Sequence, residues 1–106
     1  MITLTTEAEA EAFLTAPGPR WLLKHSNACP ISFAALEQVE AHLAAGSLPA
    51  ALVVIQDSRP LSNWLSVRLA RVHQSPQLFL LNGGSVTWAA THWSITAEAM
   101  TKAKAG

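Results

Sequence analysis

The sequence has very little cysteine: Cys29 is the only one among its 106 residues. A single cysteine excludes an internal disulfide, so a hydrophobic core must hold the fold together without cross-links. Proteins without disulfides are typical of a reducing compartment. We therefore expect a cytoplasmic protein.

Strong net charge and long apolar runs are also missing. Seven basic and seven acidic residues cancel, and no run of like charges occurs, which argues against nucleic acid or an anionic membrane as a partner. The longest apolar runs are too short to cross a bilayer. The acidic segment 1–13 lacks the positively charged start of a signal peptide.

The chain does contain enough apolar residues for one core. Half of its residues are hydrophobic, which is typical of a globular protein and argues against disorder. No internal repeat, linker or low-complexity segment divides it. We therefore predict a single domain over residues 1–106, present as a monomer.

Strand and helix signals alternate in the first half of the chain. Thr6 and Glu9 form a capping box, which predicts the start of a helix. The predicted elements are a strand over Ile2–Leu4, a helix from Thr6 to about Thr15, a buried strand over Trp21–Lys24 and a helix from Pro30 to Gly46. In the second helix, apolar residues recur at helical spacing and are expected to face the core: Phe33, Leu36, Val39 and Leu43.

The alternation continues in the second half. The β-branched run Ala51–Ile55 predicts a central strand covered on both faces. A helix begins near Pro60, with an apolar face that only Arg68 interrupts and that extends to Val72. The remaining predictions are strands over Leu78–Leu81 and Ser85–Ala90 joined by an Asn82-Gly83 hairpin turn, and a last helix capped by Ser94 or Thr96 that runs through Lys104.

The predicted order of elements is β-α-β-α-β-α-β-β-α. Right-handed crossovers make the first three strands largely parallel, and the hairpin adds an antiparallel pair. This order predicts an α/β protein with a thioredoxin-like fold, in which helices flank a central mixed sheet.

Cys29 is the first candidate for chemistry. It follows a strand and a short turn and stands where a helix begins, and the free amide groups of a helix N-terminus favour an anion such as a thiolate. A thiolate attacks disulfides. Pro30 fixes the backbone there, and Ser32 lies one turn on, where its hydroxyl can donate a hydrogen bond to sulfur but cannot form a disulfide. The competing interpretation is that Cys29 is a small buried residue.

Ser75-Pro76 is the second candidate. Because Pro76 directly precedes a predicted strand and has no N–H for a ladder, it belongs at the start of that strand. In a thioredoxin topology, a cis proline at this place faces the reactive cysteine. The residue before it, here Ser75, offers backbone groups to an extended substrate.

The topology brings several loops to one edge of the sheet, where ligands of parallel sheets tend to bind. The cationic or titratable residues expected there outnumber the one carboxylate, Asp57, and they are Lys24, His25, Arg59, His73 and His92. A cationic rim around a thiol suits a small anionic thiol ligand. The residues expected to contact it are His25, Ser26, Asn27, Ala28, Arg59, Ser75, His92 and Trp93.

Several of these residues have a second interpretation. His25 either orders the turn or stabilises the thiolate, Arg59 binds a carboxylate or is solvated surface, and Trp93 lines the ligand pocket or packs under the last helix. His25 and Cys29 alone provide too few ligands for a metal, so no metal site is predicted.

Four segments together resemble a known family. They are "KHS…CPIS" (24–32), "D.RP.SN" (57–63), "SPQLFL" (75–80) and "W..THW.ITAE" (88–98). In this order and spacing they resemble the YtxJ-like family of monothiol bacilliredoxins, from about Trp21 to Met100. One departure is Ala28, where better-known members carry threonine, so no hydroxyl role is expected at this position.

The resemblance implies a thioredoxin-like fold and a thiol-disulfide activity in the cytoplasm. Family members are thought to remove bacillithiol, a cysteinyl-glucosamine-malate, from protein mixed disulfides. The implied partners are bacillithiolated client proteins, with bacillithiol as the thiol co-substrate and no tightly bound cofactor. Since Ser32 cannot resolve the adduct on Cys29, the implied reductant is a second bacillithiol or another redox protein.

Two other classes of function remain open. One is a non-catalytic thioredoxin-like adaptor or redox sensor that stores a thiol adduct without turnover. The other is a module like the monothiol glutaredoxins, which binds glutathione or an iron–sulfur cluster. Those glutaredoxins carry a glycine-phenylalanine pair between Cys and Ser, whereas this chain has Pro30-Ile31.

Overall fold

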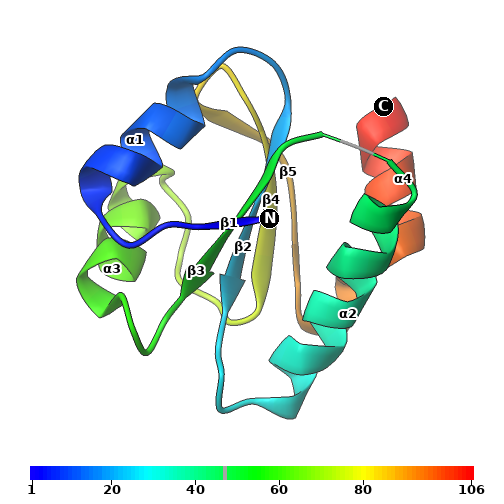
Figure 1. The fold of residues 1–106 in the computed structure, drawn as a ribbon, viewed down its shortest axis with the longest axis horizontal. Helices are drawn as coiled ribbons and strands as arrows, with labels where there is room; N and C mark the ends of the chain where they lie inside the picture. The colour runs from blue at the N-terminus through cyan, green and yellow to red at the C-terminus, as the bar shows by residue number, and fades with distance from the viewer. Residues whose placement is uncertain (47) are drawn as a thin grey trace.

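The computed structural model describes residues 1–46 and 48–106, and within them a five-stranded sheet has helices on both faces (Figure 1). The strands are β1 (Ile2–Thr3), β2 (Arg20–His25), β3 (Ala50–Val54), β4 (Gln77–Asn82) and β5 (Ser85–Thr91). The helices are α1 (Glu7–Thr15), α2 (Pro30–Ala44), α3 (Arg59–Arg68) and α4 (Ala97–Ala105), with a short 3-10 helix, η1 (His92–Ser94). This order confirms the predicted α/β fold.

The strand order gathers several strand ends at one edge of the sheet. The order is β1-β3-β2-β4-β5; β3 is parallel to β1 and β2, and β4 is antiparallel to β2 and β5. Lys24 near the end of β2 pairs with Gln77 at the start of β4, and Gln77 pairs with Thr91 at the end of β5. We call this edge, where β2, β3 and β5 end and β4 begins, the site edge.

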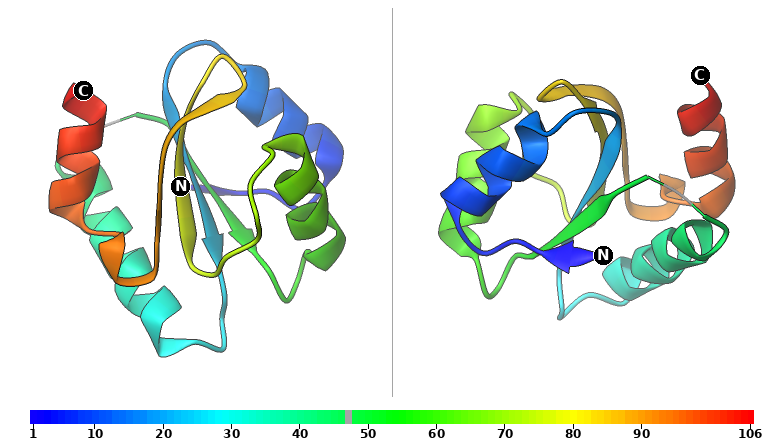
Figure 2. Two further views of the ribbon diagram at one scale, coloured as in Figure 1. Left: turned by 180° about the vertical axis from the view of Figure 1, so that it is seen from behind. Right: turned by 45° about the horizontal axis from the view of Figure 1, so that its top comes forward.

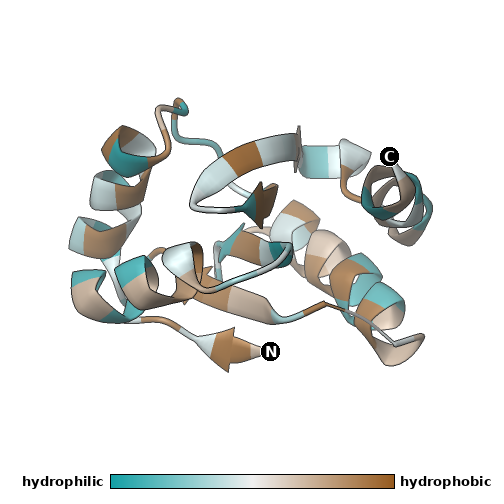
Figure 3. Cartoon of the chain, turned by 90° about the horizontal axis from the view of Figure 1, so that it is seen from above, coloured by the Kyte–Doolittle hydropathy of each residue, from teal (hydrophilic) through white to brown (hydrophobic). Residues whose placement is uncertain are grey.

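Two hydrophobic layers enclose the sheet. Helices α1 and α3 cover one face, and α2 and α4 cover the other (Figures 1 and 2). Successive side chains of a strand point to opposite faces, so Leu22 of β2 joins the core under α1 and α3, whereas Trp21 and Leu23 join the core under α2 and α4. Figure 3 shows hydrophobic and hydrophilic residues alternating along the helices, as expected of helices with one buried side.

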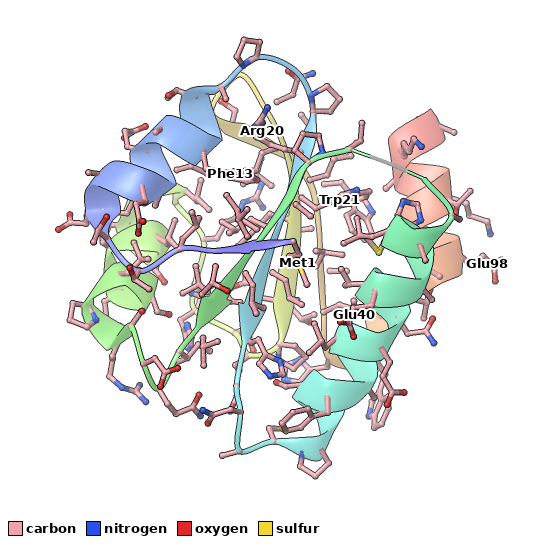
Figure 4. The ribbon with its side chains drawn as sticks, viewed as in Figure 1. Met1, Phe13, Arg20, Trp21, Glu40 and Glu98 are labelled. Carbon is pink, nitrogen blue, oxygen red and sulfur yellow. The ribbon has the colours of Figure 1, made fainter. Side chains whose placement is uncertain are left out.

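The end of the sheet opposite the site edge is occupied by Arg20. Its guanidinium lies 4.9 Å from the centre of the Phe13 ring and donates hydrogen bonds to the carbonyl oxygens of Pro17 and Gly18. Figure 4 shows Arg20 near Phe13, with Trp21 on the side of α2. This cation therefore stabilises the fold away from the site edge.

Helix α3 ends earlier than its apolar pattern predicts. It stops at Arg68 because Ala70 takes a left-handed conformation, with φ 55°, and the N–H of Arg71 donates to the carbonyl of Ser66. This is a Schellman ending, which usually contains glycine. The prediction that Val72 belongs to the buried helix face is therefore wrong, and Val72 is 82% exposed.

Arg68 joins three separate segments of the chain. Its Nε and Nη2 donate to the two carboxylate oxygens of Glu11 in α1, at 2.9 and 3.0 Å, and its Nη1 donates to the carbonyl of Gly84 in the hairpin at 3.2 Å. The polar residue that interrupts the apolar pattern of α3 therefore fastens α3 to α1 and to the β4–β5 turn.

The apolar residues of α2 divide between the core and the surface. Val39 is fully buried, and Leu36 and Leu43 are partly buried against the same core. The expectation that Phe33 faces the core is wrong, because Phe33 is 47% exposed and its ring lies against that of His25. The longest described helix, α2, has 15 residues, and no helix in the described residues is both long and apolar enough to cross a membrane.

The predicted capping box of α1 is present and offers a test of the local fold. The N–H of Glu9 donates to Thr6 Oγ1, and Glu9 Oε1 accepts from the N–H of Thr6. We predict that Thr6→Ala lowers the free energy of unfolding by about 1 kcal/mol, because the cap on the helix N-terminus is lost. Thr6→Ser, which keeps the hydroxyl, should stay near wild type in urea unfolding. Equal stability of the alanine and serine variants would contradict the role of this cap.

Candidate active site around Cys29

Cys29 is the N-cap residue of α2 and is partly exposed. Its carbonyl accepts from the N–H groups of Ser32 and Phe33, at 3.0 and 3.3 Å, whereas its side chain makes no capping hydrogen bond with the helix. Pro30 occupies the first turn of the helix, as predicted. The thiol therefore lies at the positive end of the α2 dipole and does not take part in capping the helix.

The turn that leads into Cys29 is fixed by a small hydrogen-bond network. The N–H of Ser26 donates to Ser32 Oγ at 3.3 Å, and the N–H of Ala28 donates to Ser26 Oγ at 3.3 Å. Gln56 reaches across from the loop after β3: its Nε2 donates to Ser26 Oγ at 2.7 Å, and its Oε1 accepts from the N–H of Asn27 at 3.1 Å. These bonds hold Cys29 in place.

Two features of this network differ from the sequence analysis. Ser32 is completely buried and its oxygen accepts from the N–H of Ser26; among the described residues the expected hydrogen bond from its hydroxyl to the Cys29 sulfur is not seen. Gln56 was not among the candidates. Its position just after β3, at the site edge, was the one signal that could have indicated a role. A glutamine side chain has no chemistry that marks it as a functional residue in the sequence.

The segment before β4 lies at the same edge. The Ser75–Pro76 peptide bond is cis, Pro76 is buried, and the carbonyl of Pro76 accepts from the N–H of His92 at 3.2 Å. The hydroxyl of Ser75 is buried and has no hydrogen-bond partner in the described residues. Since η1 also packs against α2, the segment carrying Pro76, the segment carrying His92 and the helix carrying Cys29 are brought together.

His25 ends β2 at the site edge, as expected, but its side chain is buried. Only 4% of it is exposed, and its ring packs edge-on against Phe33, with the ring centres 5.0 Å apart. Burial lowers the pKa of His25, and the backbone of Ser32 and the charge of Glu40 oppose this only in part. His25 therefore supports the first turn of α2, in agreement with the interpretation that it orders this region, and its contact with a ligand stays a prediction.

Lys24 is also buried, with 1% of its surface exposed. Its Nζ lies 2.8 Å from Nδ1 of His73 and donates to Ser66 Oγ at 3.4 Å. Burial lowers the pKa of Lys24 to about 8. Burial, followed by the positive charges of Lys24 and Arg59, lowers the pKa of His73. The two basic groups are thus in contact with each other, and only His73 is exposed to solvent.

The predicted cationic rim is therefore only partly present. Arg59 is exposed, His92 is partly exposed, and Trp93 is 70% exposed, so these residues are accessible at the site edge. Next to Cys29 in the chain, a hollow of about 530 Å³ is lined by Asn27, Ala28, Pro30, Phe33, Ala34 and Glu37. Because this hollow contains a carboxylate, the surroundings of the thiol carry both signs of charge.

The described residues contain no group of three or more His, Cys, Asp or Glu side chains placed to hold a metal ion. The polar groups closest to Cys29 in the chain are instead tied to the turn by the hydrogen bonds of Ser26, Ser32 and Gln56. The arrangement presents a lone thiol, and a lone thiol at a helix N-terminus is suited to exchange with a disulfide.

Comparison with known proteins identifies the family. Residues 2–100 match the family described as "Monothiol bacilliredoxin BrxC". The chain belongs to the monothiol bacilliredoxin family. A structure described as "a putative oxidoreductase with a thioredoxin fold" is 27% identical, with a TM-score of 0.92, covering 97% of this chain and 92% of the other. This monothiol bacilliredoxin is accordingly a thiol oxidoreductase.

Two thioredoxins show the same fold at lower identity. A mutant thioredoxin from Halobacterium salinarum NRC-1 is 14% identical, with a TM-score of 0.75, over 95% of this chain and 84% of that one. Fasciola hepatica thioredoxin is 15% identical, with a TM-score of 0.73, over 99% of this chain and 95% of that one. These comparisons confirm the thioredoxin-like fold of the bacilliredoxin chain.

The role of Gln56 can be tested by amide hydrogen exchange. Gln56→Ala removes the acceptor for the Asn27 N–H, and we predict that exchange at Asn27 becomes about fivefold faster, as expected for the loss of one hydrogen bond. Gln74→Ala is a matched control, because within the described residues no hydrogen bond of the Gln74 side chain is seen. Unchanged exchange at Asn27 would show that Gln56 does not hold the turn.

The contact between Lys24 and His73 predicts a measurable titration. Burial and the Lys24 charge both lower the pKa of His73 from its ordinary 6.5. Lys24→Met removes that charge, so we predict that the pKa of His73 rises toward 6.5 in an NMR titration of its ring protons. The wild-type protein, titrated under the same conditions, serves as the reference. A His73 pKa that stays fixed or falls would contradict the contact.

Proposed function

We propose that this bacilliredoxin removes bacillithiol from protein mixed disulfides through Cys29 and depends on an external thiol to be regenerated. The observation that carries the proposal is the lone, partly exposed thiol at the N-cap of α2, with the buried Ser32 at the place where a second cysteine would resolve the adduct. The proposed setting is the cytoplasm, where a single thiol stays reduced.

The first step is a thiol-disulfide exchange. The thiolate of Cys29 attacks the bacillithiol sulfur of the mixed disulfide, a new S–S bond forms between Cys29 and bacillithiol, and the bond to the client sulfur breaks. The client leaves as a thiolate and takes up a proton from water. The amide groups at the start of α2 favour the negative charge on Cys29 before the attack.

The second step requires a thiol from outside the chain. The thiolate of a second bacillithiol, or of another redox protein, attacks the bacillithiol sulfur held on Cys29. Cys29 leaves as a thiolate, and bacillithiol departs as a disulfide with the incoming thiol. Ser32 has only a hydroxyl, which cannot replace this thiol.

Accessible groups at the site edge supply the proposed binding surface. The backbone of Ser75, next to Pro76, is the proposed partner for an extended client segment. Arg59 and His92 are the proposed partners for the carboxylates of the malate group, since a guanidinium pairs well with carboxylates. Trp93, which is 70% exposed, provides an apolar wall. The hollow with Glu37 provides an acceptor for the amino group of bacillithiol.

A turnover assay tests this proposal. A client protein is modified in parallel with bacillithiol and with glutathione, and release of each thiol is followed with the wild-type protein, Cys29→Ala and Cys29→Ser. We predict multiple turnovers with excess free bacillithiol, at least about tenfold preference for the bacillithiol adduct, equivalent to about 1.4 kcal/mol, and no activity in either variant.

Two results would contradict the proposal. Equal or greater activity on the glutathione adduct would assign a different thiol to the site. A single turnover that stops despite excess bacillithiol would favour the passive redox sensor. A binding assay for the two adducts with Cys29→Ser, which cannot react, shows whether any preference arises from recognition.

A further inference from the structure

The buried Lys24 has no anionic partner among the residues that the structure describes. Only 1% of it is exposed, and the ion pairs within the described residues are Arg68–Glu11 and Lys102–Glu98. Burial of an ammonium group without a carboxylate costs free energy, and an apolar residue of similar volume is usually accommodated at lower cost. Stability alone therefore does not explain a lysine at this position in the central strand.

The contacts of Lys24 show what the lysine holds. Its ammonium donates to the carbonyl of Ser62 and the hydroxyl of Ser66 in α3, at 3.5 and 3.4 Å, and lies 2.8 Å from His73 Nδ1. When Lys24 is protonated, its ammonium group has donors and no acceptor, so Nδ1 of His73 accepts and the ring is neutral with its proton on Nε2. Lys24, which belongs to β2, thus contacts both α3 and His73, a residue that lies outside these two elements.

His73 belongs to the segment 71–75, which joins α3 to Pro76 and is exposed over residues 71–74. The segment is also attached through Gln77, the residue that pairs with Lys24 across β2 and β4. Gln77 Nε2 donates to the carbonyl of Val72, and Gln77 Oε1 accepts from the N–H of Gln74, both at 3.2 Å. Two adjacent buried polar side chains of the sheet, Lys24 and Gln77, therefore contact this exposed segment. The buried hydroxyl of Ser62 in α3 also lies 3.5 Å from His73 Nδ1.

We propose that Lys24 is a positioning residue: through His73 it holds segment 71–75 so that Ser75 and Pro76 keep their place at the site edge relative to Cys29. This inference rests on the proposed function, because the position of Ser75 and Pro76 matters for rate only if a mixed disulfide binds against them. A displacement of about 1 Å in a substrate-positioning group reduces a rate by up to about a hundredfold.

The test compares Lys24→Met, His73→Leu and His73→Asn with Lys102→Met as the matched control. Methionine keeps the length of the Lys24 side chain without the ammonium. Asparagine retains an acceptor near the place of His73 Nδ1, whereas leucine has none. Lys102 is an exposed lysine of α4, with a side chain 77% exposed. Each variant is measured for removal of bacillithiol from a client, for alkylation of Cys29 by iodoacetamide and for thermal unfolding.

Lys24→Met should lose about tenfold in kcat/KM for the client, while Cys29 alkylation stays within about twofold because the thiol itself is undisturbed. The midpoint of thermal unfolding should be unchanged or rise by several degrees, since the buried charge is removed. His73→Leu should show the same loss, and His73→Asn should recover most of it. Lys102→Met should match wild type in every measurement.

Wild-type kcat/KM in Lys24→Met would overturn the proposal. So would a loss of activity accompanied by an equal loss of alkylation rate and a lower unfolding midpoint, since that pattern indicates a purely structural lysine. Equal activity of His73→Leu and His73→Asn would show that no acceptor is needed at residue 73.

A further measurement separates this inference from the proposed function. The rates of amide hydrogen exchange at Gln74 and Ser75 report how firmly segment 71–75 is held, and they are measured without any substrate. Faster exchange in Lys24→Met than in wild type supports the anchor even if the wild-type protein fails to release bacillithiol, a failure that would reject the proposed function alone. Unchanged exchange in Lys24→Met would reject the anchor.

Discussion

The antiparallel pairing of β4 with β2 determines which segments of the chain meet at the site edge. This pairing places Lys24 opposite Gln77. The start of β4 therefore lies at the edge of the sheet where β2 ends and the turn toward Cys29 begins. Ser75 and Pro76 therefore lie at the site edge just before β4 begins, and the turn to Cys29 lies at the same edge just after β2 ends. Strand β4 also pairs with β5, and directly after β5 the N–H of His92 donates a hydrogen bond to the carbonyl of Pro76. One register thus assembles three segments that are distant in sequence.

Much of this arrangement follows from local sequence signals. The apolar periods, the Thr6 capping box and the glycines of the hairpin indicate the identity and order of the elements, because each is a property of a few neighbouring residues. The hairpin turn itself is Gly83-Gly84, one residue later than the predicted Asn82-Gly83, because Asn82 pairs with Ser85 at the end of β4. The place of Cys29 at the start of α2 follows in the same way. The end of α3 was mispredicted because Ala70 adopts the left-handed conformation that glycine usually provides.

The orientation of side chains at the site edge was harder to predict. A strand covered on both faces buries every residue, so alternation did not indicate that Lys24 and His25 are hidden on opposite faces of β2. Both were expected on an open cationic rim. Gln56 was missed because its role depends on a contact with the Ser26–Ala28 turn, which only the packed loops create. The accessible surface is consequently more mixed in charge, with Arg59 exposed and Glu37 in the hollow.

In the proposed reaction, Cys29 takes bacillithiol from a client and cannot discharge it alone. Mass spectrometry of a single turnover tests this most directly: reduced protein is mixed with an equal amount of bacillithiolated client, with no free thiol present. We predict that the mass of one bacillithiol disappears from the client and appears on Cys29, where it stays until bacillithiol is added. A client that keeps its adduct, or a disulfide between client and Cys29 as the stable product, would contradict it.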